Sequence, residues 1–471
     1  MNDSKKKRIL IPISFSFSIR YLYRTGMLHK IRDFATPVIV ITWNETDLID
    51  EMRIDGFEVH VIPESKKDEP YSNVRTKIDY WFNEFVLTST SKKVQKKYLD
   101  QFVPTKVRTQ KKLREKYNQL KFYFPGVKDK MFQLERSMLK GHTNYDEMID
   151  LVKKLNVDLV FTPTPFQTQE DILLRACKDL GKKMIATILS FDNLTKRGWI
   201  PVGYDYYMVW NKYNCQEAIS IYPKYANENN TKVVGAAQFD FYFDNKNLLP
   251  IHDWKKIAGL PDDDRKIILY AGGPKRLFPN EPQYLKDLLN ALDAGEIKGN
   301  PIVLFRCHPI DDIQRWKDWV GEHPSLFYDV SWTGKEKLQS TNVTFDNIYN
   351  LCSTLAYSQV HINLCSTMTV DGCAYKKPQI GPAYDDVNPS KAHLLRGMYS
   401  QEHFKPIIRS KGLKLANSKK ELVAYVNEAL EHPEIFTKQC NTILEEIITF
   451  RDGKSTDRVV SVIKEVIQEI I

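Results

Sequence analysis

The chain has 471 residues, of which 42% are apolar and 27% are charged, and its formal net charge is +9. This length predicts two domains, and the ordinary apolar content excludes a chain that is disordered over long stretches. No window approaches the roughly 20 apolar residues that a membrane-spanning helix needs.

The chain begins with a basic run and an apolar segment, a pattern superficially like a secretory signal peptide. Residues 5–8 are KKKR and residues 9–19 are ILIPISFSFSI. Because Arg20 and Arg24 follow at once and no small-residue cleavage site appears, we interpret residues 8–15 as a buried strand. The seven cysteines show no C-x-x-C spacing, which indicates neither a disulfide framework nor a zinc site and favours a reducing, cytoplasmic location.

Strand and helix patterns alternate along most of the chain. In the first half, strands are predicted at residues 8–15, 37–43, 57–63, 157–163, 183–190, 206–210 and 232–234, with a helix at 21–34. In the second half, they are predicted at residues 266–273, 301–308, 361–364 and 378–383. Such alternation predicts parallel sheets with helices on both faces. The predicted fold class is therefore α/β, with two Rossmann-like, doubly wound domains facing a cleft.

Residues 244–264 carry Asn, Pro and Asp and no sustained strand, so they predict the link between the two domains. We place the N-terminal domain at residues 1–243 and the C-terminal domain at residues 244–450. The last predicted helix, at residues 454–470, has its apolar residues on one face and needs a surface to pack on.

The alternating pattern breaks at residues 71–141, which predict a basic, aromatic, helical insertion in the N-terminal domain. Residues 92–130 contain thirteen basic and three acidic residues, so their net charge of +10 accounts for the whole imbalance. Basic faces beside exposed aromatics suit an anionic membrane surface. They suit binding of an acidic glycan equally well. The structural alternative is a solvated helix pair. We expect no nucleic-acid partner, because no recognition motif accompanies the charge.

Residues 361–386 form the candidate site around which we organise the chain. The strand at 361–364 runs into the turn Cys365-Ser366-Thr367, at the start of a helix over residues 369–374. Unpaired backbone N–H groups and two hydroxyls at such a turn suit an anion, above all a phosphate. Asp371, one helical turn further on, can reach a ribose hydroxyl or the turn itself. The alternative is that Ser366 and Thr367 only cap the helix.

Two other predicted strands end in candidate ligand groups. The strand at 266–273 ends in Gly272 and Gly273, where backbone can approach a ligand closely. The strand at 301–308 ends at His308, for which a purely structural role is the alternative. Because the carboxyl ends of parallel strands meet at one edge of a sheet, we expect these residues to converge with Ser366 and Thr367.

These motifs, in this order, resemble the GT-B glycosyltransferases, and in particular the branch of CDP-glycerol glycerophosphotransferases and capsule or teichoic-acid polymerising enzymes. Four sets of residues carry the resemblance: 305–309 (FRCHP); Ser366, Thr367, Thr369 and Asp371; 190–194 (SFDNL) with 209–211 and 235–240; and 452–454 (DGK) with Arg458. It covers residues 155–471 well, whereas residues 1–150 match only as a generic Rossmann half.

The resemblance implies a nucleotide-activated donor on the C-terminal domain and an acceptor on the N-terminal domain. It also implies that a closing helix, residues 451–471, crosses back to the N-terminal domain. Arg306 and Thr369 join the expected donor contacts on this ground. Many family members have a Glu pair in the donor domain, whereas this chain offers Asp371. No cofactor is implied beyond the donor, which is a co-substrate.

Asp192 is our candidate catalytic base, with His308 as the second catalytic candidate. Asp192 follows the predicted strand at 183–190, so we expect it at a carboxyl strand end, and a carboxylate there can take a proton from an acceptor hydroxyl. The alternative is a turn in which Asp192 accepts hydrogen bonds from nearby backbone N–H groups. No essential metal is expected, because the D-x-D pattern at residues 262–264 follows Pro261 and is typical of a solvated turn.

The function we expect is transfer of a sugar from a nucleotide sugar to a glycan or lipid-linked acceptor, in surface polysaccharide or glycolipid biosynthesis. The expected location is the cytoplasm, at the inner face of the membrane. A polyol-phosphate transferase of the CDP-glycerol type, or a nucleotide-sugar 2-epimerase, is the alternative enzyme. A catalytically inactive binding protein of the same fold is the third reading, and the retention of His308, Ser366 and Asp192 argues against it.

Overall fold

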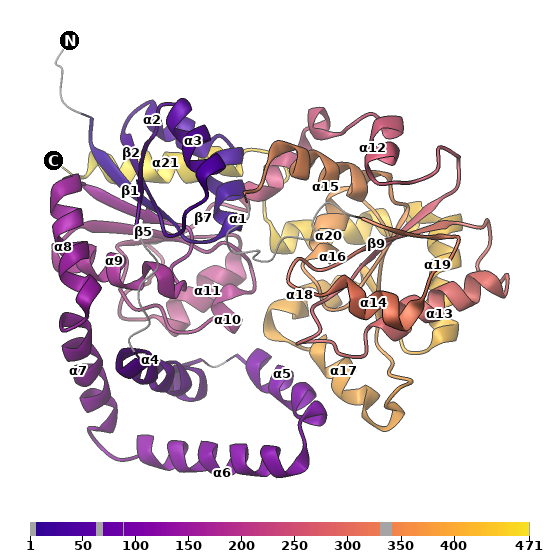
Figure 1. Ribbon diagram of the computed structural model, residues 1–471, viewed down its shortest axis with the longest axis horizontal. Helices are drawn as coiled ribbons and strands as arrows, with labels where there is room; N and C mark the ends of the chain where they lie inside the picture. The colour runs from indigo at the N-terminus through magenta and orange to yellow at the C-terminus, as the bar shows by residue number, and fades with distance from the viewer. Residues whose placement is uncertain (1–5, 63–68, 88, 330–341, 471) are drawn as a thin grey trace. The chain divides into compact units, whose positions relative to one another are not determined.

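The computed structural model describes residues 6–62, 69–87, 89–329 and 342–470, in two compact units (Figure 1). Unit 1 comprises Met1–Lys92, Asp100–Ala237 and Ser455–Ile471, and unit 2 comprises Lys93–Leu99 and Gln238–Lys454. The main division therefore falls at Ala237, a few residues before the predicted link. The short stretch Lys93–Leu99 belongs to unit 2, although the chain on both sides of it belongs to unit 1.

Unit 1 is built on a seven-stranded parallel sheet in the order β3-β2-β1-β4-β5-β6-β7. The strands are β1 (Arg8–Ile13), β2 (Thr36–Ile41), β3 (Glu58–Val61), β4 (Leu159–Thr162), β5 (Lys183–Thr187), β6 (Tyr206–Val209) and β7 (Thr231–Val233). The strand predicted at 57–63 ends at Val61, and Pro63 lies outside the described residues. Strand order reverses between β1 and β4, which is where doubly wound sheets bind ligands.

The helices of unit 1 are α1 (Ser16–Ile19), α2 (Met27–Arg32), α3 (Thr46–Ile54), α4 (Glu69–Trp81), α6 (Thr105–Phe122), α7 (Val127–Lys140), α8 (Thr143–Leu155), α9 (Thr168–Asp179), α10 (Asn193–Lys196), α11 (Lys212–Ile221) and α21 (Ser455–Gln468). Helices cover both faces of the sheet, whereas α6 of the insertion lies away from it (Figure 1). The single helix predicted at 21–34 is instead divided, because Gly26 adopts φ +74° and separates a π-helical turn, Arg20–Arg24, from α2.

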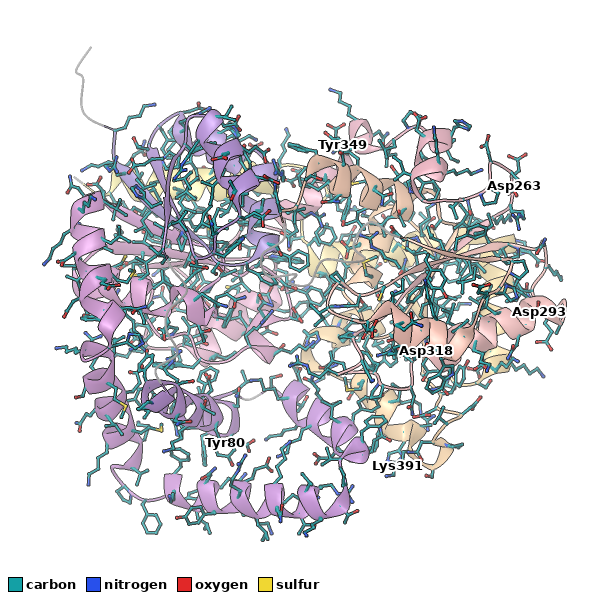
Figure 2. All side chains as sticks on the ribbon, in the orientation of Figure 1. Tyr80, Asp263, Asp293, Asp318, Tyr349 and Lys391 are labelled. Atoms are coloured by element: carbon teal, nitrogen blue, oxygen red, sulfur yellow. The ribbon has the colours of Figure 1, made fainter. Side chains whose placement is uncertain are left out.

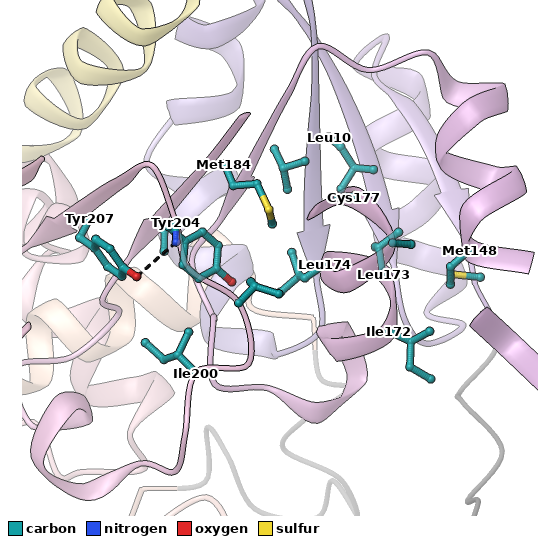
Figure 3. Close-up of a cluster of buried hydrophobic side chains, with 14 of the residues drawn as sticks. Leu10, Met148, Ile172, Leu173, Leu174, Cys177, Met184, Ile200, Tyr204 and Tyr207 are labelled. Carbon is teal, nitrogen blue, oxygen red and sulfur yellow. Dashed lines mark hydrogen bonds between the residues drawn. The ribbon is translucent and has the colours of Figure 1, made fainter. Parts of the chain in front are cut away.

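Two apolar cores lie on opposite faces of the unit 1 sheet, because successive side chains of a strand point to opposite faces. Leu10 and Met184 pack with Leu173, Leu174 and Cys177 of α9 on one face (Figure 3). On the other face, the apolar side of α21 packs against strands β1 and β4 and helix α2, through residues that are fully buried. They are Val459, Ile463 and Val466.

Helices α4 and α7 of the insertion are tied to α9 by a buried network of charges. Arg175 on α9 lies 2.7 Å from carboxylate oxygens of Asp171 and of Glu135 on α7. Arg75 on α4 lies 3.2 Å from Asp171. The neighbouring arginines keep the pKa of Asp171 low despite the raising effect of burial. By contrast, α6 has no buried residue.

Unit 2 contains a six-stranded parallel sheet in the order β10-β9-β8-β11-β12-β13. The strands are β8 (Ile267–Ala271), β9 (Ile302–Arg306), β10 (Leu326–Tyr328), β11 (Val360–Asn363), β12 (Gln379–Pro382) and β13 (Leu413–Ala416). Here the order reverses between β8 and β11, so their carboxyl ends flank the ligand position of a doubly wound fold.

The helices of unit 2 follow the strands in the usual alternation. They are α5 (Ser91–Leu99, of which Lys93–Leu99 groups here), α12 (Ile251–Ile257), α13 (Pro282–Asp293), α14 (Ile313–Val320), α15 (Phe345–Tyr357), α16 (Met368–Ala374), α17 (Ala392–Met398), α18 (Lys405–Arg409), α19 (Lys419–Glu431) and α20 (Thr437–Ile447). Helix α13 packs against α14 and α19, while α16 packs against α15 and α20. Within the described ranges, none of the helices has the length and apolar character needed to cross a bilayer.

Candidate functional site

Three neighbouring strands of unit 2 end level with one another. Ala271, the last residue of β8, pairs with Arg306 of β9 on one side and with Asn363 of β11 on the other. The residues that follow these strands are therefore brought to one edge of the sheet, as expected for Gly272, Gly273, His308, Ser366 and Thr367. This edge of unit 2 is the candidate donor site.

In the turn after β11, Ser366 and Thr367 differ in exposure and in hydrogen bonding. Cys365 adopts φ +46° and turns the chain sharply. The Oγ of half-buried Ser366 accepts a hydrogen bond from the Met368 backbone N–H at 3.2 Å, as in the capping role that we considered as the alternative. Thr367 makes no side-chain cap to α16 and is exposed. Its hydroxyl is therefore placed at the surface of the turn.

Thr369 and Asp371 on α16 have partners within the protein. Thr369 is fully buried, and its hydroxyl donates to Oδ1 of Asn363 at 2.8 Å, so it supports the turn from beneath. Asp371 is half-buried, and its Oδ1 accepts a hydrogen bond from the hydroxyl of Tyr242 at 2.6 Å. Tyr242 therefore orients the carboxylate that we expect to reach a ribose hydroxyl or the turn itself.

His308 follows β9 and is neutral at physiological pH. Burial lowers the pKa of His308 to about 4, against the raising effect of Asp311. Its Nδ1 accepts a hydrogen bond from the Ile310 backbone N–H at 3.3 Å. Assigned from this bond, the tautomer has its proton on Nε2. Nε2 can then donate a hydrogen bond to a phosphate oxygen.

Arg306 and Gly272 contact other protein side chains at this edge of the sheet. The Arg306 guanidinium, 8% exposed, is paired with the buried carboxylate of Asp329. A Cβ on Gly272 would lie 2.7 Å from the ring of Trp316. The absence of a side chain at Gly272 is therefore required by the neighbouring aromatic ring, a physical reason that differs from the expected approach of a ligand.

Glu281 is a buried carboxyl that sequence reasoning did not select. It lies directly before α13, and its Oε2 accepts a hydrogen bond from the Gly273 backbone N–H at 2.8 Å. Burial raises the pKa of Glu281 to about 8, so that it is largely protonated at neutral pH. The signal available in sequence is only an acidic residue before Pro282 at a helix start.

Asp192 lies in unit 1, between β5 and the short helix α10. Its Oδ2 is 3.3 Å from Nζ of Lys196, and its Oδ1 accepts a hydrogen bond from the Asn193 side chain at 3.2 Å. The Asp192 side chain does not cap α10. The partners of its carboxylate in the structure therefore include side chains, which differs from the backbone-capping turn that we considered as the alternative.

A second buried carboxyl in unit 1, Glu170 of α9, also escaped sequence analysis. It accepts hydrogen bonds from the hydroxyls of Ser14 and Thr164, and from that of Thr162 at 2.6 Å. Ser14 follows β1 and Thr162 ends β4, so this cluster lies where the strand order of unit 1 reverses. Burial raises the pKa of Glu170 to about 7, although the three hydroxyls act in the opposite direction. Hydroxyl residues at the ends of two adjacent strands are the sequence signal.

The basic insertion exposes apolar and aromatic side chains beside its lysines. On α6, Nζ of Lys121 lies 4.4 Å from the ring centroid of Tyr117, a cation–π arrangement. The most exposed apolar side chains at and after this helix are Leu113 (63%), Leu120 (62%), Tyr123 (75%) and Phe124 (66%). This surface combines positive charge with exposed apolar side chains.

The D-x-D segment has local partners. The carboxylate of Asp262 lies 2.9 Å from Nδ1 of His252. Asp263 lies near the surface of unit 2 (Figure 2), and its carboxylate pairs with Arg265 at 2.8 Å. In the described part of the chain, no group of three or more His, Cys, Asp and Glu side chains is arranged to hold a metal ion. A surface hollow of about 480 Å³ lies between Arg265, Lys298 and Glu431, at the amino-terminal edge of the unit 2 sheet, and Lys298 and Glu431 there pair with each other.

No protein-family model matches the chain, and no curated protein matches it. Solved structures do match it over almost its whole length. A UDP-GlcNAc 2-epimerase from Methanocaldococcus jannaschii aligns with 97% of this chain and 99% of its own, at 11% identity and a TM-score of 0.56. The 2-epimerase from Neisseria meningitidis bound to UDP-GlcNAc aligns with 97% of this chain and 100% of its own, at 10% identity and a TM-score of 0.55.

A glycosyltransferase from Rickettsia africae aligns with 99% of both chains, at 13% identity and a TM-score of 0.52. The chain has the GT-B fold. The predicted pair of doubly wound α/β domains is thereby confirmed. At these identities the likeness establishes the GT-B architecture of the chain, and its chemistry is argued from its own residues below.

Proposed function

We propose that this GT-B chain is a glycosyltransferase that moves a sugar from a nucleotide-sugar donor to a glycan or lipid-linked acceptor. The observation that carries this proposal is the level ending of β8, β9 and β11, which brings His308 and the Ser366–Thr367 turn to one edge beside the switch point of unit 2. Hydrogen-bond donors gathered at this position suit a diphosphate.

The proposed contacts bind different groups of the donor, its phosphates and its ribose. The neutral His308 ring donates from Nε2, and the exposed Thr367 hydroxyl donates from the neighbouring turn. Lys275 and Arg276, both exposed, follow Gly273 and add positive charge near the phosphates. Each hydrogen bond to a charged phosphate contributes about 1.5–3 kcal/mol. Asp371, oriented by Tyr242, accepts from a ribose hydroxyl.

Transfer breaks the bond between the sugar and the phosphate, so that the nucleotide leaves as the acceptor oxygen bonds to the sugar. The acceptor hydroxyl must lose its proton in this step, and we assign the acceptance of that proton to Asp192. Its carboxylate lies 3.3 Å from Nζ of Lys196, which can hold the carboxylate in position for this step. The acceptor is a glycan or a lipid-linked glycan, and the basic surface of α6 would hold it or the anionic membrane that carries it. The reaction that we propose takes place at the cytoplasmic face of a membrane.

A donor panel tests the function. Purified protein is mixed with UDP-, GDP-, CDP- and CMP-linked donors, and melting temperature and donor breakdown are recorded. A rise in melting temperature with one nucleotide class, together with slow hydrolysis of its sugar-linked form, is expected. Conversion of a UDP-sugar to its 2-epimer without breakdown would indicate an epimerase, and breakdown of CDP-glycerol alone would indicate a polyol-phosphate transferase. Binding of no donor would reject the donor site.

A further inference from the structure

Helix α5 places one aromatic side chain inside unit 2. The helix belongs by sequence to the basic insertion, but its residues Lys93–Leu99 group with unit 2. Tyr98 is 3% exposed, and its ring centroid lies 5.9 Å from that of Phe278, which is also buried. Val94, one turn earlier on the helix, lies near Gly397 of α17. Residues Lys93–Leu99 of the insertion are therefore packed within unit 2.

The neighbours of Tyr98 come from the carboxyl ends of several strands. Phe278 and Glu281 follow β8, Cys365 follows β11, and Asp385 follows β12. Burial raises the pKa of Tyr98, and the nearby Asp385, Glu281 and Cys365 raise it further. Phe278, on which Tyr98 packs, lies beside Gly273 together with Glu281, so Tyr98 lies at the same edge as the candidate donor site.

The seat of Tyr98 leaves the phosphate-binding turn accessible. Thr367 remains exposed and Ser366 half-buried with the phenol ring in place. A side chain that occupied the whole site would bury both hydroxyls. Tyr98 therefore leaves the turn open and borders the site through its contact with Phe278.

The groups around Tyr98 suit hydroxyls better than phosphates. Oε2 of Glu281 is bonded to Gly273, whereas Oε1 is buried and has no hydrogen-bond partner among the described residues. A buried polar atom without a partner is costly, and a ligand hydroxyl would satisfy it. Asp385, 3% exposed, adds a second carboxyl. These carboxyls and the phenol can bind a group rich in hydroxyls.

We propose that Tyr98 is a specificity-determining residue of the donor site, and that with Glu281 it forms the subsite for the hydroxyl-rich group that the donor carries beyond its phosphates. This inference rests on the proposed function, because it assumes a nucleotide-linked donor at the Ser366–Thr367 turn. It assigns to the insertion a role in donor choice, separate from its basic surface.

Calorimetric titration separates this subsite from the phosphate site. The nucleoside diphosphate selected by the donor panel, and the same nucleotide linked to its sugar, are titrated into wild type, Tyr98→Ala and Tyr98→Phe. We expect Tyr98→Ala to weaken the sugar-linked donor about tenfold and the free diphosphate less than about twofold. Tyr98→Phe retains the ring and should lose about threefold toward the sugar-linked donor. Gln95→Ala, on the same helix, is the matched control and should change neither.

Three results for Tyr98→Ala would each overturn the proposed subsite. They are an equal loss of affinity for both ligands, an unchanged affinity for both, and tighter binding of the sugar-linked donor. Alkylation of Cys365 by iodoacetamide, followed by mass spectrometry without nucleotide, tests the location of the ring independently. Removal of the ring in Tyr98→Ala should raise the labelling rate, and an unchanged rate would remove Tyr98 from this edge. If wild type binds no donor, the proposed function fails and the donor subsite fails with it. A faster labelling of Cys365 in Tyr98→Ala would still support the position of Tyr98.

Discussion

The hydroxyl of Tyr242 donates a hydrogen bond of 2.6 Å to Oδ1 of Asp371. Tyr242 lies in the 3-10 helix Ala237–Phe243, and Asp371 lies in the first turn of α16, so the bond joins segments that are distant in sequence. It fixes the direction of the carboxylate that is our proposed ribose contact.

Removal of this bond should weaken binding of the donor through its ribose. We expect Tyr242→Phe to lower nucleotide affinity about threefold and Asp371→Ala about tenfold. The measurement is titration with the preferred nucleoside diphosphate and with its 2′,3′-dideoxy form. If Asp371 contacts the ribose, the dideoxy nucleotide binds wild type and Asp371→Ala equally weakly. A loss that is the same for both nucleotides would assign Asp371 to the turn alone.

Replacement of His308 tests the phosphate contact. His308→Ala should weaken donor binding about tenfold, because one hydrogen bond to a charged group is lost. Since burial lowers the pKa of His308 to about 4, its ring stays neutral above pH 5. The donor affinity of wild type and of His308→Ala should therefore change with pH in the same way near pH 6.5. His393→Ala, at an exposed position of α17, is the control. Wild-type affinity in His308→Ala would move the donor site elsewhere.

The base assignment rests on kinetics. Asp192→Asn keeps the size of the side chain but cannot accept a proton, so turnover should fall about a hundredfold or more with little change in donor affinity. The melting temperature should stay near that of wild type. The opposite pattern, a lowered melting temperature with normal turnover per folded molecule, would make Asp192 a structural turn residue.

The Glu170 cluster predicts a pH dependence of stability. The pKa of Glu170 rises from an ordinary value of 4.5 to about 7 on folding, so the folded state holds this proton more tightly. Its contribution is complete below about pH 4.5 and is lost as pH rises through 7, by about 3 kcal/mol in total. Glu170→Gln is neutral at every pH. The difference in unfolding free energy between wild type and variant, from urea titrations at pH 5 and pH 8, should therefore shrink as pH rises, and a constant difference would contradict the shift.

Sedimentation with vesicles tests the basic surface of α6. Simultaneous replacement of Lys106, Lys111, Lys112 and Lys116 by Gln should reduce binding to anionic vesicles, at roughly 1 kcal/mol per lysine in low salt. High salt should reduce binding of the wild type in the same way. Zwitterionic vesicles are the control. Equal, salt-insensitive binding by both proteins would leave α6 as an ordinary solvated helix.

The predicted β/α alternation is confirmed for every strand of unit 1, including the edge strands β3 and β7, and for the four inner strands of unit 2, whereas the two edge strands of unit 2 were missed. β10 and β13 lie at the two ends of the unit 2 sheet and are only three and four residues long. Their inner residues are half-buried, so they lack the continuous apolar run that marked β8 and β9. In unit 2 the sequence therefore predicted the interior of the sheet better than its margins.

What the sequence alone determined about the candidate site is the set of residues that follow buried parallel strands. Gly273, His308 and Ser366 were predictable because parallel strands end at a common edge, whatever the details of packing. The roles of Glu281 and Tyr98 were decided only by the tertiary structure. Their proximity joins segments more than 180 residues apart in the printed chain. Such contacts, and the burial that keeps Glu281 protonated, arise from the packing of whole helices, which local residue patterns do not encode.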